Sequence, residues 1–223
     1  IFKYGTNMKF SIDFKKLGFA KEKKIYLEND GNLAAYSEYL SHFKNDYKNL
    51  IMLTFGTGVG GGIIYNSEIF KGSGNAGEIG RILINEKSYL EDVISAKAWT
   101  KKCQELYEIN KETKLSNIFY EEKVGSLLFD RSIDLEDYEK YARDEIIQNT
   151  SNALISLFEL FDNDIFVIGG SMTKSPYDFL PLLDEYISKN FEFPNRNFPK
   201  IKLSKAREDS GMLGAALLAL NSE

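Results

Sequence analysis

Glycine is concentrated in one short segment of this sequence, where it could help to bind an anion. Residues 56–62 have the sequence GTGVGGG. Backbone N–H groups that no Cβ atom shields can point into one concavity and hold a negatively charged group. The hydroxyl group of Thr57 would add a hydrogen-bond donor. A tight hairpin with a bulge explains the same glycines equally well, so the segment on its own predicts either an anion cradle or a plain turn.

Two familiar nucleotide-binding patterns do not fit this segment. Gly56, Gly58 and Gly61 match the spacing of the dinucleotide fingerprint, and Glu78 lies 20 residues beyond Gly58. That fingerprint requires a helix directly after the loop, whereas a β-prone run and a turn follow here. A Walker A loop requires Gly-Lys followed by Ser or Thr, and this string is absent. The sequence therefore argues against both a dinucleotide fold and a P-loop.

Three carboxylates stand where they could exchange protons or accept hydrogen bonds. Asp30 follows an apolar run at residues 25–28, so we expect it at the end of a strand, where it could act as a general base toward a hydroxyl group. Glu78 and Glu91 can only accept hydrogen bonds when they are ionised. Simpler interpretations remain open. Residues 29–31 (NDG) are typical of a turn, and Glu91 could be a solvated residue at the start of a helix.

The periodicity of apolar residues predicts the elements that must position these side chains. Strands are predicted at residues 25–28, 50–55, 63–65, 68–70, 165–168 and 201–203. Helices are predicted at residues 33–43, 89–107, 134–161, 177–190 and 212–220. Asp134 is the predicted N-cap of the long helix, with Asp137 in the capping-box position, and residues 110–133 are less regular. Alternating strands and helices in the second half predict an α/β sheet flanked by helices.

Composition and charge narrow the class of protein. The chain has 223 residues, 43% of them hydrophobic, which is enough for a self-sufficient core. Its formal net charge is −5, and without a basic block it is a poor candidate for binding nucleic acid. The single Cys103 excludes an intrachain disulfide and a multi-cysteine zinc cluster, and indicates an intracellular protein. No apolar run is long enough to predict a membrane span.

Five segments, in order and spacing, closely resemble the ROK family. Residues 27–35 (LENDGNLAA), 55–62 (FGTGVGGG) and 74–80 (GNAGEIG) carry most of the resemblance. Residues 165–171 (IFVIGGS) are similar to the family's nucleoside-proximal strand and glycine turn, and residues 211–216 (GMLGAA) to its terminal helix. The family contains bacterial sugar kinases and sugar-responsive repressors. Any one of these segments is weak evidence, but three in order with the correct spacing are strong evidence, and the resemblance extends over nearly the whole chain.

The resemblance implies a fold and a division of the chain. The family has the α/β, ribonuclease H-like fold of actin and hexokinase, with two lobes. Residues 1–48 would be the remainder of the smaller N-terminal lobe, and residues 49–223 the larger C-terminal α/β lobe. The chain begins at Ile1 and lacks the Asp-x-Gly-Gly-Thr hairpin with which these kinases hold Mg²⁺ and the outer phosphates. We therefore expect the N-terminal lobe to be incomplete and the printed chain to contain no metal site of its own.

The resemblance also implies roles for individual residues. Asp30 would be the catalytic base, and Asn29 and Asp30 would hydrogen-bond the sugar. Glu78 and Glu91 would contact sugar hydroxyl groups. The resemblance implies that ATP is bound by a further set of residues, which consists of Gly56, Thr57, Gly58, Gly169 and Gly170.

Two departures from the family pattern concern the sugar site and zinc. Arg81 stands where the family has His, and it could either donate to the sugar or pair with Glu78 or Glu91. Residues 82–88 replace the family's Cys-rich zinc loop, so we expect no zinc. His42, the single histidine, is far from any nucleophile motif and is expected to be a surface or packing residue.

The function implied by the resemblance is ATP- and Mg²⁺-dependent phosphorylation of a hexose-type sugar, at O6. The first expectation for the sugar is N-acetylmannosamine, and glucose or a β-glucoside is the alternative. Two other classes stay open: a sugar-responsive transcriptional repressor and a sugar-binding relic without transfer activity. The kinase interpretation implies a cytoplasmic homodimer whose partners are the sugar and ATP, with neither nucleic acid nor a membrane.

Overall fold

The computed structural model describes residues 24–109, 129, 134–135, 137–170, 179–192, 195–206 and 209–221. The expectations for residues 1–23, for nearly all of the irregular stretch 110–133 and for the first residues of the helix predicted at 177–190 lie outside these described residues. Among the described helices, none is long and apolar enough to cross a membrane.

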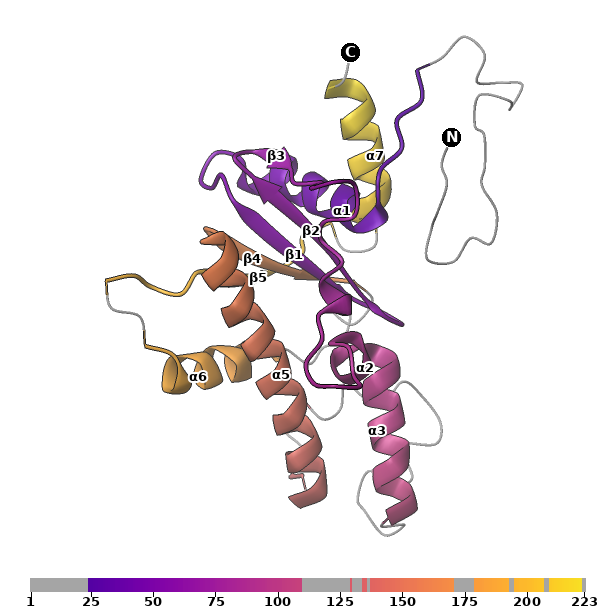
Figure 1. Cartoon of the computed structure of the whole chain (residues 1–223), viewed down its shortest axis with the longest axis vertical. Coiled ribbons are helices and arrows are strands. Elements are labelled where there is room, and N and C mark those ends of the chain that lie inside the picture. Colours follow the sequence, from indigo (N-terminus) through magenta and orange to yellow (C-terminus); the bar gives the residue numbers. More distant parts are fainter. Residues whose placement is uncertain are drawn as a thin grey trace, which may run out of the picture.

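A five-stranded mixed sheet forms the centre of the described structure (Figure 1). Its spatial order is β3-β2-β1-β4-β5. The strands are β1 (Leu50–Phe55), β2 (Val59–Tyr65), β3 (Glu68–Ile69), β4 (Ile165–Gly169) and β5 (Lys200–Leu203). β1 is antiparallel to β2 and parallel to β4, and β4 is parallel to β5. β1 and β4 are almost continuously buried, which is typical of parallel strands covered on both faces.

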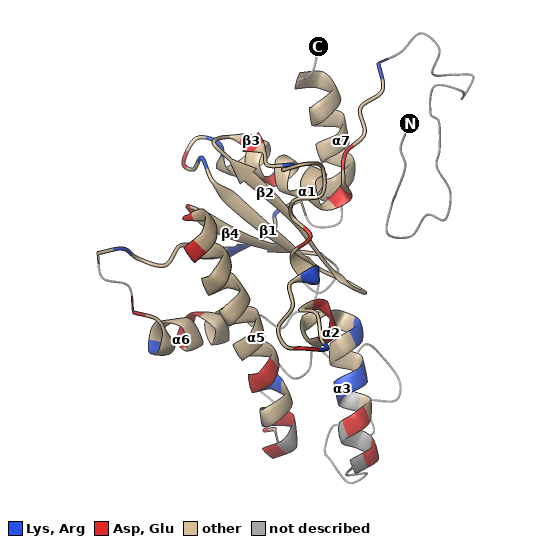
Figure 2. Ribbon diagram, viewed as in Figure 1, with Lys and Arg blue, Asp and Glu red and all other residues tan. Residues whose placement is uncertain are grey.

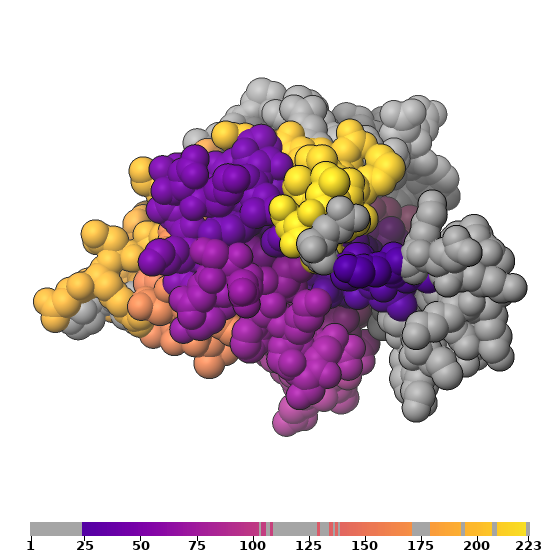
Figure 3. Space-filling model, turned by 90° about the horizontal axis from the view of Figure 1, so that it is seen from above, coloured from indigo at the N-terminus to yellow at the C-terminus, as the bar shows by residue number. Residues whose placement is uncertain are grey.

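Helices cover both faces of the sheet (Figure 1). α1 (Asp30–Glu38) continues as a π-helical turn (Tyr39–Phe43) and packs with α7 (Ser210–Asn221) on one side. Figure 3, seen from above, shows α7 in yellow at the surface beside the early part of the chain. The other side is covered by α2 (Glu91–Ile94), α3 (Ala96–Ile109), α5 (Asp137–Phe161) and α6 (Leu180–Asn190). The sheet is therefore the middle layer between two apolar clusters.

Glycines allow α1 to lie directly on β2. A Cβ atom on Gly62 would lie 2.4 Å from the carbonyl oxygen of Gly31, and one on Gly31 would lie 2.3 Å from that of Gly61. A Cβ atom on Gly214 of α7 would lie 1.9 Å from the carbonyl oxygen of Leu33. Because real Cβ atoms do not come so close to backbone, these positions require glycine. The close approach fixes the start of α1 against the glycine-rich strand.

Most of the predicted elements are confirmed, but one predicted strand is absent and several elements begin at other residues; the strand predicted from residue 63, for example, begins at Val59. Residues 25–28 form no strand and take no part in the described sheet, and residues 25–27 are exposed. The helix predicted from residue 33 begins at Asp30, because the side chain of Asn29 caps it. The helix predicted from Asp134 begins at Asp137, so Asp134 lies before the helix and is not its N-cap.

The helix predicted at residues 89–107 is interrupted at Ser95. The backbone of Ser95 is extended, with ψ at 159°, and it separates α2 from α3. Its Oγ atom accepts a hydrogen bond of 3.1 Å from the N–H of Ala98, which satisfies one donor at the start of α3. This break turns the start of α3 toward the loop after β1.

Candidate active site

One cavity of about 600 Å³ collects most of the side chains that the sequence singled out. It lies where the start of α1, the β1–β2 loop, the loop after β3 and the starts of α2 and α3 meet. Its lining residues are Asn29, Asp30, Thr54, Phe55, Gly56, Thr57, Gly58, Val59, Gly60, Gly61, Gly77, Glu78, Arg81, Glu91, Lys97 and Gly170. The volume is within the usual range of small-ligand sites.

Asp30 reaches the cavity from the first turn of α1. Oδ1 of Asn29 accepts hydrogen bonds from the N–H groups of Gly31, at 2.8 Å, and Asn32, at 3.2 Å. Oδ1 of Asp30 also accepts from the N–H of Gly31, at 2.9 Å. The expected strand end is thus replaced by a capped helix start, and the backbone holds the Asp30 carboxylate at the cavity.

A cluster of three residues, Glu28, Asn32 and Lys71, lies beside this helix start; we call it the Glu28 cluster. Oε1 of Glu28 accepts from Nδ2 of Asn32, at 2.9 Å, and from the N–H of Asn29, at 3.1 Å. Nζ of Lys71 lies 2.5 Å from Oε2 of Glu28, whose side chain is only 6% exposed. The cluster ties the loop after β3 to the residues that carry Asp30.

The electrostatic state of Glu28 follows from these contacts. Burial raises the pKa of its carboxyl group, but hydrogen bonds from Lys71, Asn32 and the N–H of Asn29, together with the charge of Lys71, lower it further, so that the net pKa is below its ordinary value of 4.5. Glu28 and Lys71 were not singled out in the sequence, because only the fold brings them together over 43 residues of chain.

The glycine segment forms a three-residue hairpin loop between β1 and β2. Phe55 pairs with Val59, and the N–H of Gly56 donates to the carbonyl oxygen of Gly58 at 3.0 Å. The carbonyl oxygen of Gly56 accepts from the N–H of Ala96 at 2.9 Å. The loop is therefore a hairpin, as one interpretation had it, and it also lines the cavity, as the anion cradle requires. The strand that follows confirms that it is no dinucleotide fingerprint.

Charged side chains also line the cavity from the loop that leads to α2 and from the start of α2. The guanidinium group of Arg81 lies 4.0 Å from the ring centroid of Tyr89, and its Nη1 lies 4.0 Å from Oε1 of Glu91. Both charged side chains are partly exposed, and Glu78 immediately precedes the short 3₁₀ helix Ile79–Arg81. A Cβ atom on Gly58 would lie 2.8 Å from Oε2 of Glu91. Of the two roles expected for Arg81, pairing with Glu91 is the one that the geometry shows.

Gly169 and Gly170, both expected at the nucleotide, are placed differently. Gly170 lines the cavity with a φ of +93°, and a Cβ atom there would lie 2.3 Å from the carbonyl oxygen of Phe55. Gly169 is buried within β4, opposite Thr54, and does not line the cavity. Only Gly170 is therefore positioned to face a ligand.

Lys97 also lines the cavity and adds an ammonium group to it, but it was not predicted from the sequence. It stands outside every segment that resembles the family. Among the described residues, no group of three or more His, Cys, Asp or Glu side chains is arranged to hold a metal ion. His42 is exposed on the turn after α1 and does not line the cavity, and its ring contacts Phe43.

These features define a class of protein: the fold is the actin/hexokinase-like α/β fold, with a carboxylate and a glycine loop facing one cavity. The family model of the ROK family matches residues 11–222. The chain belongs to the ROK family, as its motifs predicted.

Relatives with assigned names are kinases of different sugars. A glucokinase from Thermotoga maritima is 26% identical over 210 residues, covering 87% of this chain and 65% of the relative. An N-acetylmannosamine kinase from Haemophilus influenzae is 27% identical over 197 residues, covering 87% of this chain and 63% of the relative. The chain thus spans less than two thirds of the length of these relatives.

Solved structures show the same fold. A ROK family glucokinase from Streptomyces griseus, in complex with glucose and AMPPNP, has a TM-score of 0.74 at 23% identity and covers 87% of this chain and 68% of that one. A ROK family transcriptional regulator, described as a homologue of the E. coli MLC protein, has a TM-score of 0.71 at 21% identity and covers 86% of this chain and 51% of that one. One fold therefore accommodates both an enzyme and a regulator.

Proposed function

We propose that the protein containing this chain transfers the γ-phosphoryl group of ATP to a hydroxyl group of a hexose-type sugar, at O6. The observation that carries this proposal is the shared cavity, which Asp30 lines together with the glycine loop, Glu78 and Glu91. A base for the hydroxyl group, donors for phosphate and acceptors for sugar hydroxyls are the three parts that the reaction needs. The kinase names of the relatives support the same class.

Asp30 would orient the attacking hydroxyl group and accept its proton. The transition state of phosphoryl transfer is loose, so little proton transfer is needed early, and positioning contributes most of the effect. The capped start of α1 supplies that positioning, because the N–H of Gly31 donates to the side chains of both Asn29 and Asp30 and the N–H of Asn32 donates to that of Asn29. Glu78 and Glu91 would accept hydrogen bonds from the sugar and thereby select its stereochemistry.

Mg·ATP would occupy the part of the cavity that the glycine loop and Gly170 line. Mg²⁺ bound through nucleotide phosphates needs few protein carboxylates. ATP supplies the phosphoryl group, and Mg²⁺ would neutralise its charge. Gly56, Thr57, Gly58 and Gly170 are the proposed nucleotide residues. Cytoplasmic location and a homodimer remain part of the proposal.

N-acetylmannosamine is the first sugar that we propose, and glucose or a β-glucoside is the alternative. The relatives carry both kinds of name, so the test must compare the sugars directly. Arg81 and Glu91 form the wall on which the choice depends.

A sugar-responsive repressor is the second candidate, because a ROK transcriptional regulator shares the fold. It would bind the sugar in the same cavity without releasing ADP.

The test is sugar-dependent ADP release by the intact gene product with Mg·ATP. The panel contains N-acetylmannosamine, glucose, N-acetylglucosamine, mannose, fructose and cellobiose. We expect release with one of the first two sugars, and a 10²–10⁴-fold lower kcat in Asp30→Asn, as expected on removal of a general base. Asp46→Asn, an exposed acid outside the cavity, is the matched control. Folded protein that releases no ADP with any sugar, or an Asp30→Asn variant with normal turnover, would contradict the proposal.

A further inference from the structure

Lys97 stands in the first turn of α3 and lines the cavity on the side of the glycine loop. We propose that its ammonium group binds the phosphate groups of the nucleotide. This inference rests on the proposed kinase function and adds a cation to the phosphate site. The supporting observations are the anchoring of α3, the absence of a carboxylate beside Lys97 on its own helix, and the charge of the cavity.

The backbone of Lys97 is held at a fixed place relative to the glycine loop. The N–H of Ala96, its neighbour, donates to the carbonyl oxygen of Gly56 at 2.9 Å. Ser95 caps the helix from the other side, and the ring of Trp99 is only 1% exposed in the core below. The first turn of α3 is thus bonded to the loop that would hold the nucleotide phosphates, so Lys97 is carried to that loop by rigid structure.

The helix itself gives Lys97 no acidic neighbour. The residues three and four positions further along α3 are Thr100 and Lys101, and neither is acidic; the residues before Lys97 on the far side of the break at Ser95 belong to α2. Other lysines of α3 differ: Lys101 pairs with Glu105 at 3.5 Å, and Lys102 pairs with Glu145 at 2.7 Å. Figure 2 shows the basic positions along α3 below the acidic residues of α2. Within the described part of the chain, Lys97 is exposed and has no ion pair within 4.0 Å, so its charge is available to a ligand.

The acidic lining of the cavity is the reason to expect a cation at the phosphate groups. Asp30, Glu78 and Glu91 bring three carboxyl groups to the lining, and the guanidinium group of Arg81 is already near Glu91. A protein cation beside the phosphate groups, in addition to Mg²⁺, would offset the repulsion between the polyphosphate and these carboxylates. A lysine ammonium group supplies such a point charge to phosphate oxygens.

The experiment compares Lys97→Met with Lys101→Met, one turn further along the same helix, in the intact gene product. For Lys97→Met we expect the KM for Mg·ATP to rise about 10-fold or more, as for the loss of a charged hydrogen bond, with the KM for the sugar unchanged. The KM for Mg·ATP should also depend less on KCl between 50 and 200 mM, because one screened attraction is gone (~10 Å screening length at 0.1 M). Lys97→Arg should restore most of the affinity, and Lys101→Met should behave as the wild type.

Two results would overturn the inference while leaving the kinase intact. One is a Lys97→Met variant with an unchanged KM for Mg·ATP. The other is a raised KM for the sugar alone, which would place Lys97 at the sugar. If the wild type releases no ADP, the proposed function fails, and thermal stabilisation by Mg·ADP decides about Lys97 separately. Stabilisation of the wild type that is lost in Lys97→Met supports the inference, whereas equal stabilisation, or none in the wild type, overturns it.

Discussion

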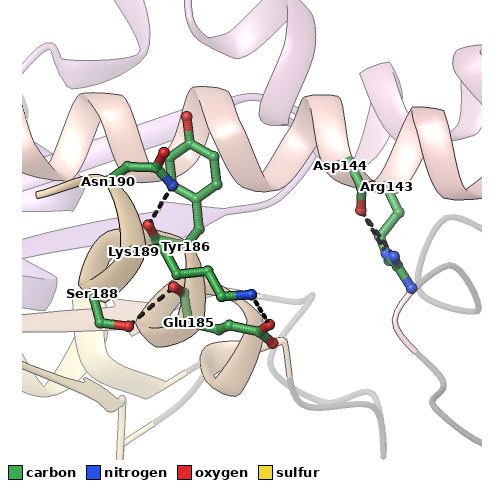
Figure 4. A network of polar contacts seen from close by, with 7 residues as sticks. All are labelled: Arg143, Asp144, Glu185, Tyr186, Ser188, Lys189 and Asn190. Atoms are coloured by element: carbon green, nitrogen blue, oxygen red, sulfur yellow. Dashed lines mark hydrogen bonds and ion pairs between the residues drawn. The ribbon is translucent and has the colours of Figure 1, made fainter.

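The Glu28 cluster beside the cavity and the polar network on α6 use similar contacts in very different settings. On α6, Nζ of Lys189 lies 2.7 Å from Oε1 of Glu185, and both side chains are more than half exposed (Figure 4). In the Glu28 cluster, Nζ of Lys71 lies 2.5 Å from a carboxylate that is almost fully buried. The α6 pair is four residues apart within one helix, whereas Lys71 and Glu28 join two segments that the fold brings together.

The comparison shows that the distance between two charged groups does not by itself determine how much their ion pair stabilises the protein. An exposed pair on a helix contributes about 0.3–0.5 kcal/mol, because solvent screens it and both side chains lose rotational freedom. A buried carboxylate that loses its partners leaves charge or polar groups unsatisfied, at about 1–3 kcal/mol. The buried cluster also holds the loop that leads to Glu78 against the helix start that carries Asp30. We therefore expect it to act on both stability and turnover.

The largest effect on stability is expected from Gly62→Ala, which tests how closely α1 packs on β2 next to the Glu28 cluster. The new Cβ atom would lie 2.4 Å from the backbone of Gly31, so α1 must shift away from β2. We expect a loss of about 1–3 kcal/mol in the free energy of unfolding, measured in urea. Gly211→Ala in α7 is the control, because its nearest contact is at 4.0 Å. Equal stability of the two variants would contradict the close approach.

Glu28→Gln is expected to have the next largest effect. The amide cannot accept from Lys71 and Asn32 as the carboxylate does, and the group is buried. We expect about 1–3 kcal/mol lower stability and a lower kcat at a nearly unchanged KM for ATP. Glu185→Gln on α6 should stay within about 0.5 kcal/mol of the wild type. A similar loss in both variants would remove the contrast between the two regions.

Lys71→Met should have a smaller effect than Glu28→Gln, because half of the Lys71 side chain is exposed. We expect up to about 1 kcal/mol of stability to be lost, compared with at most about 0.5 kcal/mol for Lys189→Met. Steady-state kinetics separate the roles: if the ion pair positions the loop, kcat falls in Lys71→Met only, and Lys71→Arg restores it. An unchanged kcat in Lys71→Met would show that the ion pair between Lys71 and Glu28 has only a structural role.

The smallest effect on stability is expected on acidification. Because the pKa of Glu28 in the folded protein lies below its ordinary value of 4.5, the cluster contributes stability above about pH 4.5. That contribution is lost as the pH falls through the folded-state pKa. The stability of the wild type should therefore approach that of Glu28→Gln on acidification, in thermal unfolding from pH 7 to 3. If the difference in stability between the wild type and Glu28→Gln grew toward low pH, its sign would contradict a lowered pKa of Glu28.

Much of the fold could be predicted because its signals are local. The uninterrupted apolar runs that became β1 and β4, and the turn that joins β2 to β3, are properties of neighbouring residues. The motifs also predicted most of the cavity lining, from Asp30 and the glycine loop to Glu91. The predicted strand at 25–28 failed because a strand needs a partner in space, which an apolar run does not guarantee.

The sequence by itself determined the family, the order of the central elements and most of the chemical groups that line the candidate site. Only the tertiary structure decided that Asp30 begins a helix packed on β2, that Lys71 reaches Glu28, and that Lys97 lies beside the glycine loop. The reason is physical. Propensity and periodicity act over a few residues, whereas the approach of two backbones and the charge around a cavity depend on segments that meet only when the chain has folded.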